Sequence, residues 1–179
     1  MRPVVLYTLL SLDGVAESPD QFVFDWDDRL DNNLAVVIGE QDAVLLGHQM
    51  YDEWADYWPT SDVEPFASFI NGVQKYVVTS SEPQGDWGPR TLVTDDLESF
   101  VAELRTTDGG AIGIHGSIRL AQSLLSAGLV DELRLVIAPA TVGSGRRLFE
   151  SDELRRWDLI TSEGSPSGEL LLHYRRHTS

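Results

Sequence analysis

The tripeptide His115-Gly116-Ser117 carries the atoms best suited to binding a charged ligand, because it joins a buried strand to a helix. The apolar run over 111–114 indicates the strand, and the apolar spacing over 117–126 indicates the helix. A helix that begins at Ser117 leaves its first amide groups without internal partners, beside a glycine that lets a ligand approach the backbone. These amides and the positive end of the helix dipole favour a phosphate or diphosphate.

The same three residues would also suit an ordinary strand-to-helix connection capped by Ser117, so the spacing alone leaves that alternative open. A second glycine-rich segment, GSG at 143–145, follows Pro139 and precedes Arg146 and Arg147. A flexible connection would have the same composition. The two arginines favour a loop that borders the site.

Two further residues, Asp13 and Trp26, are candidates for contact with a substrate. Asp13 precedes Gly14, so its carboxylate would either form a simple turn, order the loop, or hold a substrate or a water molecule at the mouth of a cleft. Trp26 offers a wall for a flat ring or fills the core. The neighbouring Asp27 and Asp28 are interpreted as acids that interact with the dipole of the following helix.

Composition excludes several classes of function. The 179 residues carry a formal net charge of −16, which opposes binding to nucleic acid or to an anionic membrane. The chain has no cysteine, and its four histidines lack the spacing of a zinc site, so no metal is expected. The sequence lacks a bilayer-spanning apolar run and a signal-peptide cleavage site, so we expect a cytoplasmic protein.

The elements expected to position these residues alternate between strands and helices. Strands are predicted at 4–10, 43–46, 75–79, 90–93, 111–114, 133–138, 157–163 and 169–176, and helices at 27–40, 48–57, 97–104 and 117–126. A long loop is expected over 13–25, and a surface loop with some helical turn over 63–72. The order predicts one α/β domain spanning 1–179, with a mostly parallel sheet and a C-terminal antiparallel hairpin.

Four segments in this order carry a family resemblance: LSLDG at 10–14, LLGHQMYDEWADYWP at 45–59, KYVVTSS at 75–81, and the stretch 113–149. Together they resemble the dihydrofolate reductase-like superfamily, and within it the branch related to the reductase domain of the riboflavin-pathway deaminase/reductase. The resemblance extends from about residue 4 to 175. It implies a doubly wound sheet with helices on both faces that binds NADPH, with NADH possible, across the carboxyl ends of its strands.

The resemblance also implies which residues form the site. The loop that follows the first strand would close over the nicotinamide, the loop after the second strand would bind the diphosphate or adenosine side, and the turn after the third would lie near the adenosine ribose. The strand-to-helix turn would wrap the diphosphate. The cofactor-binding residues implied in this way are Gly14, Gly47, His48, Gln49, Met50, Thr79, Ser80, Ser81, His115, Gly116, Ser117, Ile118, Arg119 and Leu120.

The sequence departs from the family pattern at three points. His48 and Met50 stand where relatives often carry Arg and Thr, which removes a cation and a hydroxyl. The pair His115-Gly116 replaces a Gly-Gly pair and disfavours the cis peptide bond typical there. A deaminase domain and its zinc signature are missing from the sequence. These differences leave open the choice between NADPH and NADH, and they weigh against the riboflavin-pathway substrate.

The leading hypothesis is therefore an NADPH-dependent reductase that transfers hydride to a small polar heterocycle or sugar-derived imine, with Asp13 and Trp26 as candidate catalytic residues. A non-catalytic nucleotide-binding or sensor module that keeps the fold is the alternative. A structural homo-oligomer built through the terminal hairpin is a third hypothesis. The resemblance implies a homodimer in every case.

Overall fold

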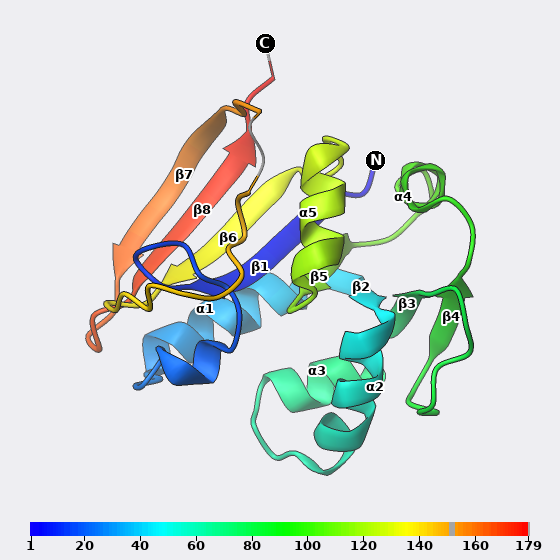
Figure 1. Ribbon diagram of the computed structural model, residues 1–179, viewed down its shortest axis with the longest axis horizontal. Coiled ribbons are helices and arrows are strands. Elements are labelled where there is room, and N and C mark those ends of the chain that lie inside the picture. The colour runs from blue at the N-terminus through cyan, green and yellow to red at the C-terminus, as the bar shows by residue number, and fades with distance from the viewer. Residues whose placement is uncertain (151–152, 179) are drawn as a thin grey trace.

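The computed structural model describes residues 1–150 and 153–178, and its centre is one eight-stranded sheet (Figure 1). The strand order is β4-β3-β2-β5-β1-β6-β8-β7, and β8 runs antiparallel to both of its neighbours. The strands are β1 (Val4–Leu10), β2 (Gln41–Gly47), β3 (Gln74–Val78), β4 (Arg90–Val93), β5 (Ala111–His115), β6 (Glu132–Ile137), β7 (Trp157–Gly164) and β8 (Leu170–Arg176). This topology confirms the expected α/β class with its C-terminal antiparallel hairpin.

Helices cover both faces of the sheet. They are α1 (Asp28–Gly39), α2 (His48–Tyr57), α3 (Phe66–Gly72), α4 (Leu97–Leu104) and α5 (Ile118–Ser126), with short 3-10 turns at Pro19–Gln21 and Trp58–Thr60. Alternation along β1 divides the core between the faces: Leu6 packs with residues of α4 and α5, whereas Val5 and Tyr7 pack with residues of α1, α2 and α3. The result is a doubly wound sheet between two helical layers.

Local signals in the sequence define where several helices begin. Asp27 caps α1 by accepting hydrogen bonds from the amides of Arg29 and Leu30, and Asp96 caps α4 by accepting from Ser99. Asp27 therefore acts as a helix N-terminal acid, as the sequence analysis expected. The helices α2 and α5 differ, because no side chain caps either of them.

The sequence predicts a surface loop with some helical turn over 63–72, and the helical part is longer than this prediction allowed. Residues Phe66–Gly72 form the helix α3, and Phe66, Ala67 and Ile70 are buried on one side of it. The segment lacks a side-chain cap and is only seven residues long, so local sequence predicts it weakly. Burial of this apolar side against the core stabilises the helix.

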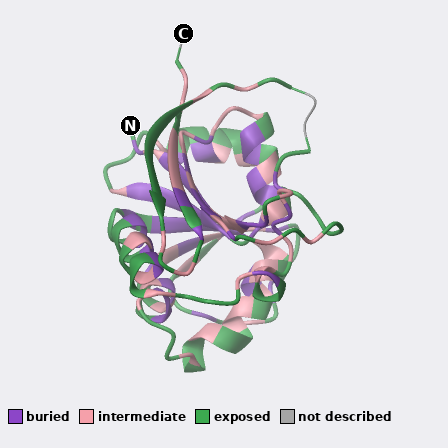
Figure 2. Cartoon of the chain, turned by 90° about the vertical axis from the view of Figure 1, so that its left-hand side faces the viewer, coloured by how far each residue is buried: buried purple, intermediate pink, exposed green. Residues whose placement is uncertain are grey.

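The terminal hairpin lies at the edge of the sheet. Figure 2 shows buried residues concentrated in the central strands, whereas the outer strand β7 of the hairpin is exposed and β8 is mostly intermediate. Seven of the eight residues of β7 are exposed, among them Leu159 and Ile160. None of the helices in the described part of the chain is long and apolar enough to cross a membrane.

Candidate functional site

A pocket of about 890 Å³ opens at the carboxyl ends of β1, β2 and β5, three adjacent strands. Crevices at this end of open α/β sheets are the usual place for ligands. Its wall is contributed by β1, the loop after it, α1, α2, the segment before α3, the start of α5 and the loop after β6. The lining residues include Tyr7, Thr8, Leu9, Ala16, Glu17, Ser18, Trp26, Asp31, Leu34, Gly47, His48, Gln49, Met50, Trp54, Trp58, Phe66, His115, Gly116, Ser117, Ile118, Arg119, Leu120 and Arg146.

Two helix N-termini meet at this pocket. The helix α2 begins after Gly47 and α5 begins after Ser117, and neither start is capped by a side chain. The Ser117 hydroxyl instead accepts a hydrogen bond from the amide of Gly47 at 3.0 Å, which joins the two helix starts. Free amides of both helices are therefore available at one wall, where their dipoles favour an anion.

Gly116 is required by the geometry of this wall. Its φ of +69° lies in the left-handed region, and a Cβ atom there would stand 3.0 Å from Cζ2 of Trp54 and 3.1 Å from Cε of Met50. A larger residue would strain the turn and push these side chains towards the cavity. The cis peptide bond among the described residues joins Glu64 and Pro65, so the His115–Gly116 bond is trans.

His48 is held by hydrogen bonds on both sides of its ring. Nδ1 lies 2.9 Å from the hydroxyl of Thr79, and Nε2 lies 3.0 Å from a carboxylate oxygen of Asp52. Ser81 approaches the same Nδ1 at 3.5 Å, and both Ser80 and Ser81 are exposed. The structure thus brings Thr79 and Ser81 against a residue of the pocket wall rather than into the wall itself. Both ring nitrogens of His48 are already engaged.

His115 lies inside the domain at the end of β5 and is 3% exposed. Burial lowers its pKa to about 3, so the imidazole is neutral at physiological pH. Its Nε2 donates to the side-chain carbonyl of Gln41 at 2.8 Å, which orients the ring. His115 therefore shapes the pocket and supplies no positive charge to it.

Two arginines supply the positive charge of the wall. Arg119 stands in the first turn of α5, where it adds to the helix dipole. Arg146 comes from the glycine-rich loop that the sequence analysis singled out, and its guanidinium pairs with Glu17 at 2.7 Å. An anion that enters the pocket would meet the helix amides and these two cations.

Asp13 holds two loops together. Its carboxylate accepts hydrogen bonds from the amides of Val142 at 3.0 Å and Gly143 at 2.8 Å, and from the hydroxyl of Ser11 at 2.7 Å. These bonds, that from Ser11 foremost, hold the pKa of the Asp13 carboxyl well below its usual value. This geometry corresponds to the loop-ordering interpretation. Gly14, at φ +81°, makes the adjacent turn, and neither residue is in the pocket wall.

Trp26 does line the pocket, where its indole N–H donates to Asp31 at 2.7 Å. Asp31 lies in the first turn of α1, where its sequence signal is the same as that of the other acids at the helix start, so the sequence did not single it out. Tyr7 was missed as well, since it reads as one more member of an apolar strand. The period-2 alternation of β1 was the available signal, because it directs Tyr7 and Leu9 to the same side.

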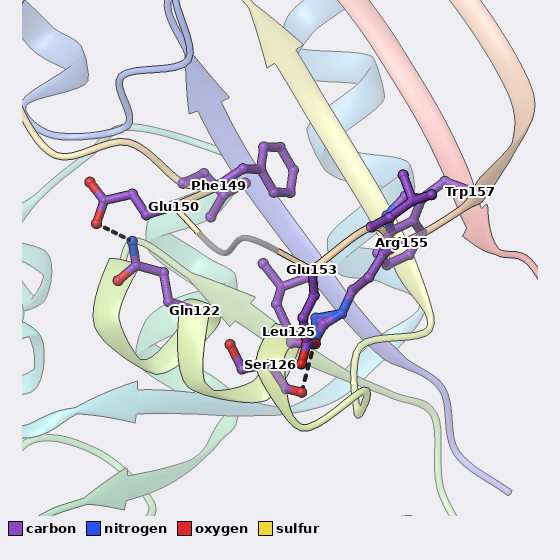
Figure 3. A pocket seen from close by; sticks show the side chains of 10 residues that line it. Gln122, Leu125, Ser126, Phe149, Glu150, Glu153, Arg155 and Trp157 are labelled. Carbon is purple, nitrogen blue, oxygen red and sulfur yellow. Dashed lines mark hydrogen bonds and ion pairs between the residues drawn. The ribbon is translucent and has the colours of Figure 1, made fainter.

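A second cavity, of about 570 Å³, lies between α5 and the segment that leads to β7 (Figure 3). Leu125, Leu148 and Trp157 contribute apolar walls. The guanidinium of Arg155 donates to the carbonyls of Leu125 and Ser126, so it caps the end of α5. None of its lining residues belongs to the larger pocket.

The sheet and the larger pocket define an open, doubly wound α/β domain in which two helix N-termini without side-chain caps meet at a pocket at the carboxyl ends of the strands. The model of the RibD C-terminal domain family matches residues 2–171, and the chain belongs to that family. The chain is 27% identical over 154 residues to the uncharacterized protein YyaP of Bacillus subtilis, covering 83% of this chain and 80% of YyaP. It is 28% identical over 181 residues to the uncharacterized protein YwjB of the same organism, covering 98% of each.

Solved structures share the fold at lower identity. A putative riboflavin biosynthesis protein from a Shewanella species superimposes with a TM-score of 0.79 at 18% identity, covering 98% of this chain and 99% of the other. The deaminase/5-amino-6-(5-phosphoribosylamino)uracil reductase of Thermotoga maritima gives 0.66 at 17%, covering 98% of this chain and 57% of the other. Dihydrofolate reductase from Enterococcus faecalis, complexed with NADP(H), gives 0.64 at 14%, covering 98% and 97%.

Proposed function

We propose that this protein is an NADPH-dependent reductase that acts by hydride transfer on a small polar heterocycle or sugar-derived imine. The observation that carries the proposal is the meeting of the α2 and α5 N-termini, neither capped by a side chain, at one wall of a large pocket. Membership of the RibD C-terminal domain family and the likeness to a dihydrofolate reductase complexed with NADP(H) support it.

The residues present fit a dinucleotide. Amides at the start of α2 and α5 would bind the diphosphate, and Arg119 would balance part of its charge. Gly47, Gln49, Met50, Ile118 and Leu120 line the same wall. The turn at Thr79, Ser80 and Ser81 would lie near the adenosine ribose. The close approach permitted by Gly116 leaves room for the phosphates.

When bound, the reduced nicotinamide supplies the hydride. The chain's own residues orient the substrate and exclude water from it. Trp26 would form a wall for a flat ring, and the Asp31 carboxylate bonded to it would hold a substrate N–H. Asp13 would act indirectly, because it fixes the loops that carry Glu17 and Arg146 beside the pocket.

One observation favours the alternative of a nucleotide-binding module without turnover. Both ring nitrogens of His48 are engaged by Thr79 and Asp52, so this position offers a phosphate no free donor where relatives often have arginine. NADH remains a possible cofactor for the same reason. In either case we propose a cytoplasmic homodimer, with the exposed strand β7 as its contact surface.

Titration of the protein with NADPH and NADH tests the proposal, with tryptophan fluorescence as the readout because Trp26, Trp54 and Trp58 line the pocket. We expect a micromolar dissociation constant for at least one nucleotide. Gly116→Val should weaken that binding by about a hundredfold or more, because its side chain would press on Trp54 and Met50.

Gly39→Val is the control, since Gly39 lies at the end of α1 outside the pocket and a Cβ atom there would meet nothing within 4 Å. It should bind nucleotide as the wild type does. Binding of neither nucleotide by the wild type would remove the proposal. Binding without oxidation of NADPH across a panel of imines and unsaturated heterocycles would favour the module without turnover.

A further inference from the structure

The hydroxyl of Thr79 is contacted by three groups, and its single proton can serve only one of them. Its oxygen lies 2.5 Å from the carbonyl oxygen of Ser81, 3.1 Å from the amide nitrogen of Ser81 and 2.9 Å from Nδ1 of His48. Two oxygens at 2.5 Å need a proton between them, so the hydroxyl donates to the carbonyl. The amide of Ser81 and Nδ1 of His48 then both donate to the hydroxyl oxygen, which places a proton on Nδ1.

The other ring nitrogen of His48 also needs a proton. Nε2 lies 3.0 Å from Oδ2 of Asp52, and an ionised carboxylate accepts but cannot donate. The second carboxylate oxygen, Oδ1, accepts from the backbone amides of Gln84 at 3.0 Å and Gly85 at 3.4 Å. Both ring nitrogens therefore act as donors, which is the geometry of the positively charged imidazolium.

This ring stands at the start of α2. His48 is the first residue of the helix and lines the larger pocket, whereas Asp52, one turn further along, contacts His48 and does not line the pocket. Their side chains are 32% and 24% exposed, so solvent screens the pair only in part. With two ring protons on His48 the pair is neutral. With one proton it leaves the negative charge of Asp52 beside the amides of the helix start.

The other charged or titratable side chains around His48 are Glu53 on α2, Glu82 in the loop after β3, Arg119 on α5 and His115 on β5. Glu53 accepts a hydrogen bond from Gln49, and Glu82 pairs with Arg90 at 3.0 Å. His115 is neutral because burial lowers its pKa to about 3. Among these residue types, histidine is the one that changes its charge near neutral pH. The charge that can vary at this wall is therefore that of His48.

The wall already carries more negative than positive side chains. The residues that line it include five carboxylates, those of Glu17, Asp20, Asp31, Glu53 and Glu64, against two arginines. In a protein of net charge −16, an uncompensated charge on Asp52 would oppose an anion further. Both N–H groups of His48 are engaged, so the imidazolium favours an anion through its charge and not through a hydrogen bond.

We propose that His48 makes the anion affinity of the pocket depend on pH: with two ring protons it cancels the charge of Asp52 at the start of α2, and loss of the Nδ1 proton weakens anion binding there. The proposal rests on the proposed function for the identity of the anion, a dinucleotide diphosphate, and deepens it by adding a regulating group. Since the protonated form binds the anion more tightly, affinity falls as the pH rises.

The dissociation constant of NADPH, measured from about pH 6 to about pH 8.5, tests the proposal in the wild type, His48→Arg and His48→Gln. His48→Arg keeps its charge throughout, so the ratio of the wild-type constant to that of His48→Arg cancels any titration of the nucleotide itself. We expect this ratio to rise about five- to tenfold with pH. The ratio of His48→Gln to His48→Arg should stay high and constant.

Nitrogen NMR of the His48 ring, in the protein without nucleotide, reads the protons directly. The ring signals are identified by their absence from His48→Gln. We expect two protonated nitrogens at the low-pH end of the range and one at the high-pH end, with the change at the same pH as the change in affinity. A ring that carries one proton throughout would overturn the proposal.

His177→Gln is the control, because His177 pairs with Asp158 at 2.9 Å and is not among the residues that line the pocket. It should keep the wild-type dependence on pH. If NADPH binds and the wild-type ratio is constant across the range, this proposal fails and the proposed function stands. If NADPH does not bind at any pH, the proposed function fails, and the same ratio is measured with inorganic pyrophosphate. A constant ratio there, or no binding of pyrophosphate, would overturn the role of His48.

Discussion

Replacement of Ser117 by alanine tests whether one hydrogen bond holds the two helix starts together. The Ser117 hydroxyl accepts from the amide of Gly47 at 3.0 Å, and Ser117 is 8% exposed. In Ser117→Ala this amide loses its acceptor, while the backbone of α5 is unchanged. The amides of α2 would then be free to move relative to those of α5.

The size of the effect follows from the burial of the two groups. A lost hydrogen bond costs about 1 kcal/mol net, and an unsatisfied buried donor costs up to about 3 kcal/mol. Water reaches the half-buried Gly47 through the pocket, so we expect about 1–2 kcal/mol. For a domain of this size that lowers the melting temperature by about 2–8 °C. An equal loss of binding free energy would raise the dissociation constant of NADPH about five- to thirtyfold.

Calorimetric unfolding and NADPH titration measure the two effects. Ser123→Ala is the control, because Ser123 is exposed and, among the described residues, its hydroxyl bonds only to the carbonyl of Arg119 within the same helix. It should change neither quantity by more than about 0.5 kcal/mol. The reasoning would be refuted by a Ser117→Ala variant that matches the control in both stability and affinity.

Three further predictions concern stability. Burial lowers the pKa of His115 to about 3, so its neutral form contributes its full share of the free energy of unfolding above pH 6.5, and that share is lost as the pH falls towards 3. Urea unfolding at pH 7 and at pH 4.5 measures this loss. The free energy of unfolding should fall less between the two pH values in His115→Gln than in the wild type. Asp131→Ala should lower the free energy of unfolding, measured in urea, by about 2–4 kcal/mol, because the amide of Val4 and the guanidinium of Arg105 lose the carboxylate that accepts from both. A decrease below about 1 kcal/mol would contradict this. Leu124→Ala, at a fully buried position of α5, should lower the free energy of unfolding by about 2–5 kcal/mol. Val36→Ala, at an exposed position, should lower it by less than about 1 kcal/mol. Equal decreases in the two variants would argue against the core described here.

Much of the architecture follows from local sequence. Apolar runs bounded by polar turns located the strands, and Asp27 marked the start of α1, which its side chain caps. The full extent of α3 escaped prediction because the helix is short and uncapped, and the core contacts that stabilise it involve residues distant in sequence.

The site could be predicted only in part. Three adjacent residues, His115-Gly116-Ser117, predict the strand-to-helix turn, and all three line the pocket. Tyr7 and Asp31 belong to different elements, and only the packing of α1 against β1 brings them to one wall. The role of Asp13 in ordering the loops depends on amides 129 and 130 residues away, which no local pattern reveals.

The most direct test of the account follows the backbone amides themselves, by recording amide proton and nitrogen chemical shifts while NADPH is added. Contact with the two helix starts predicts the largest shifts at residues 48–50 and 117–120. Shifts concentrated around Trp157 and Leu125, in the smaller cavity, or no shifts at saturating nucleotide, would contradict it.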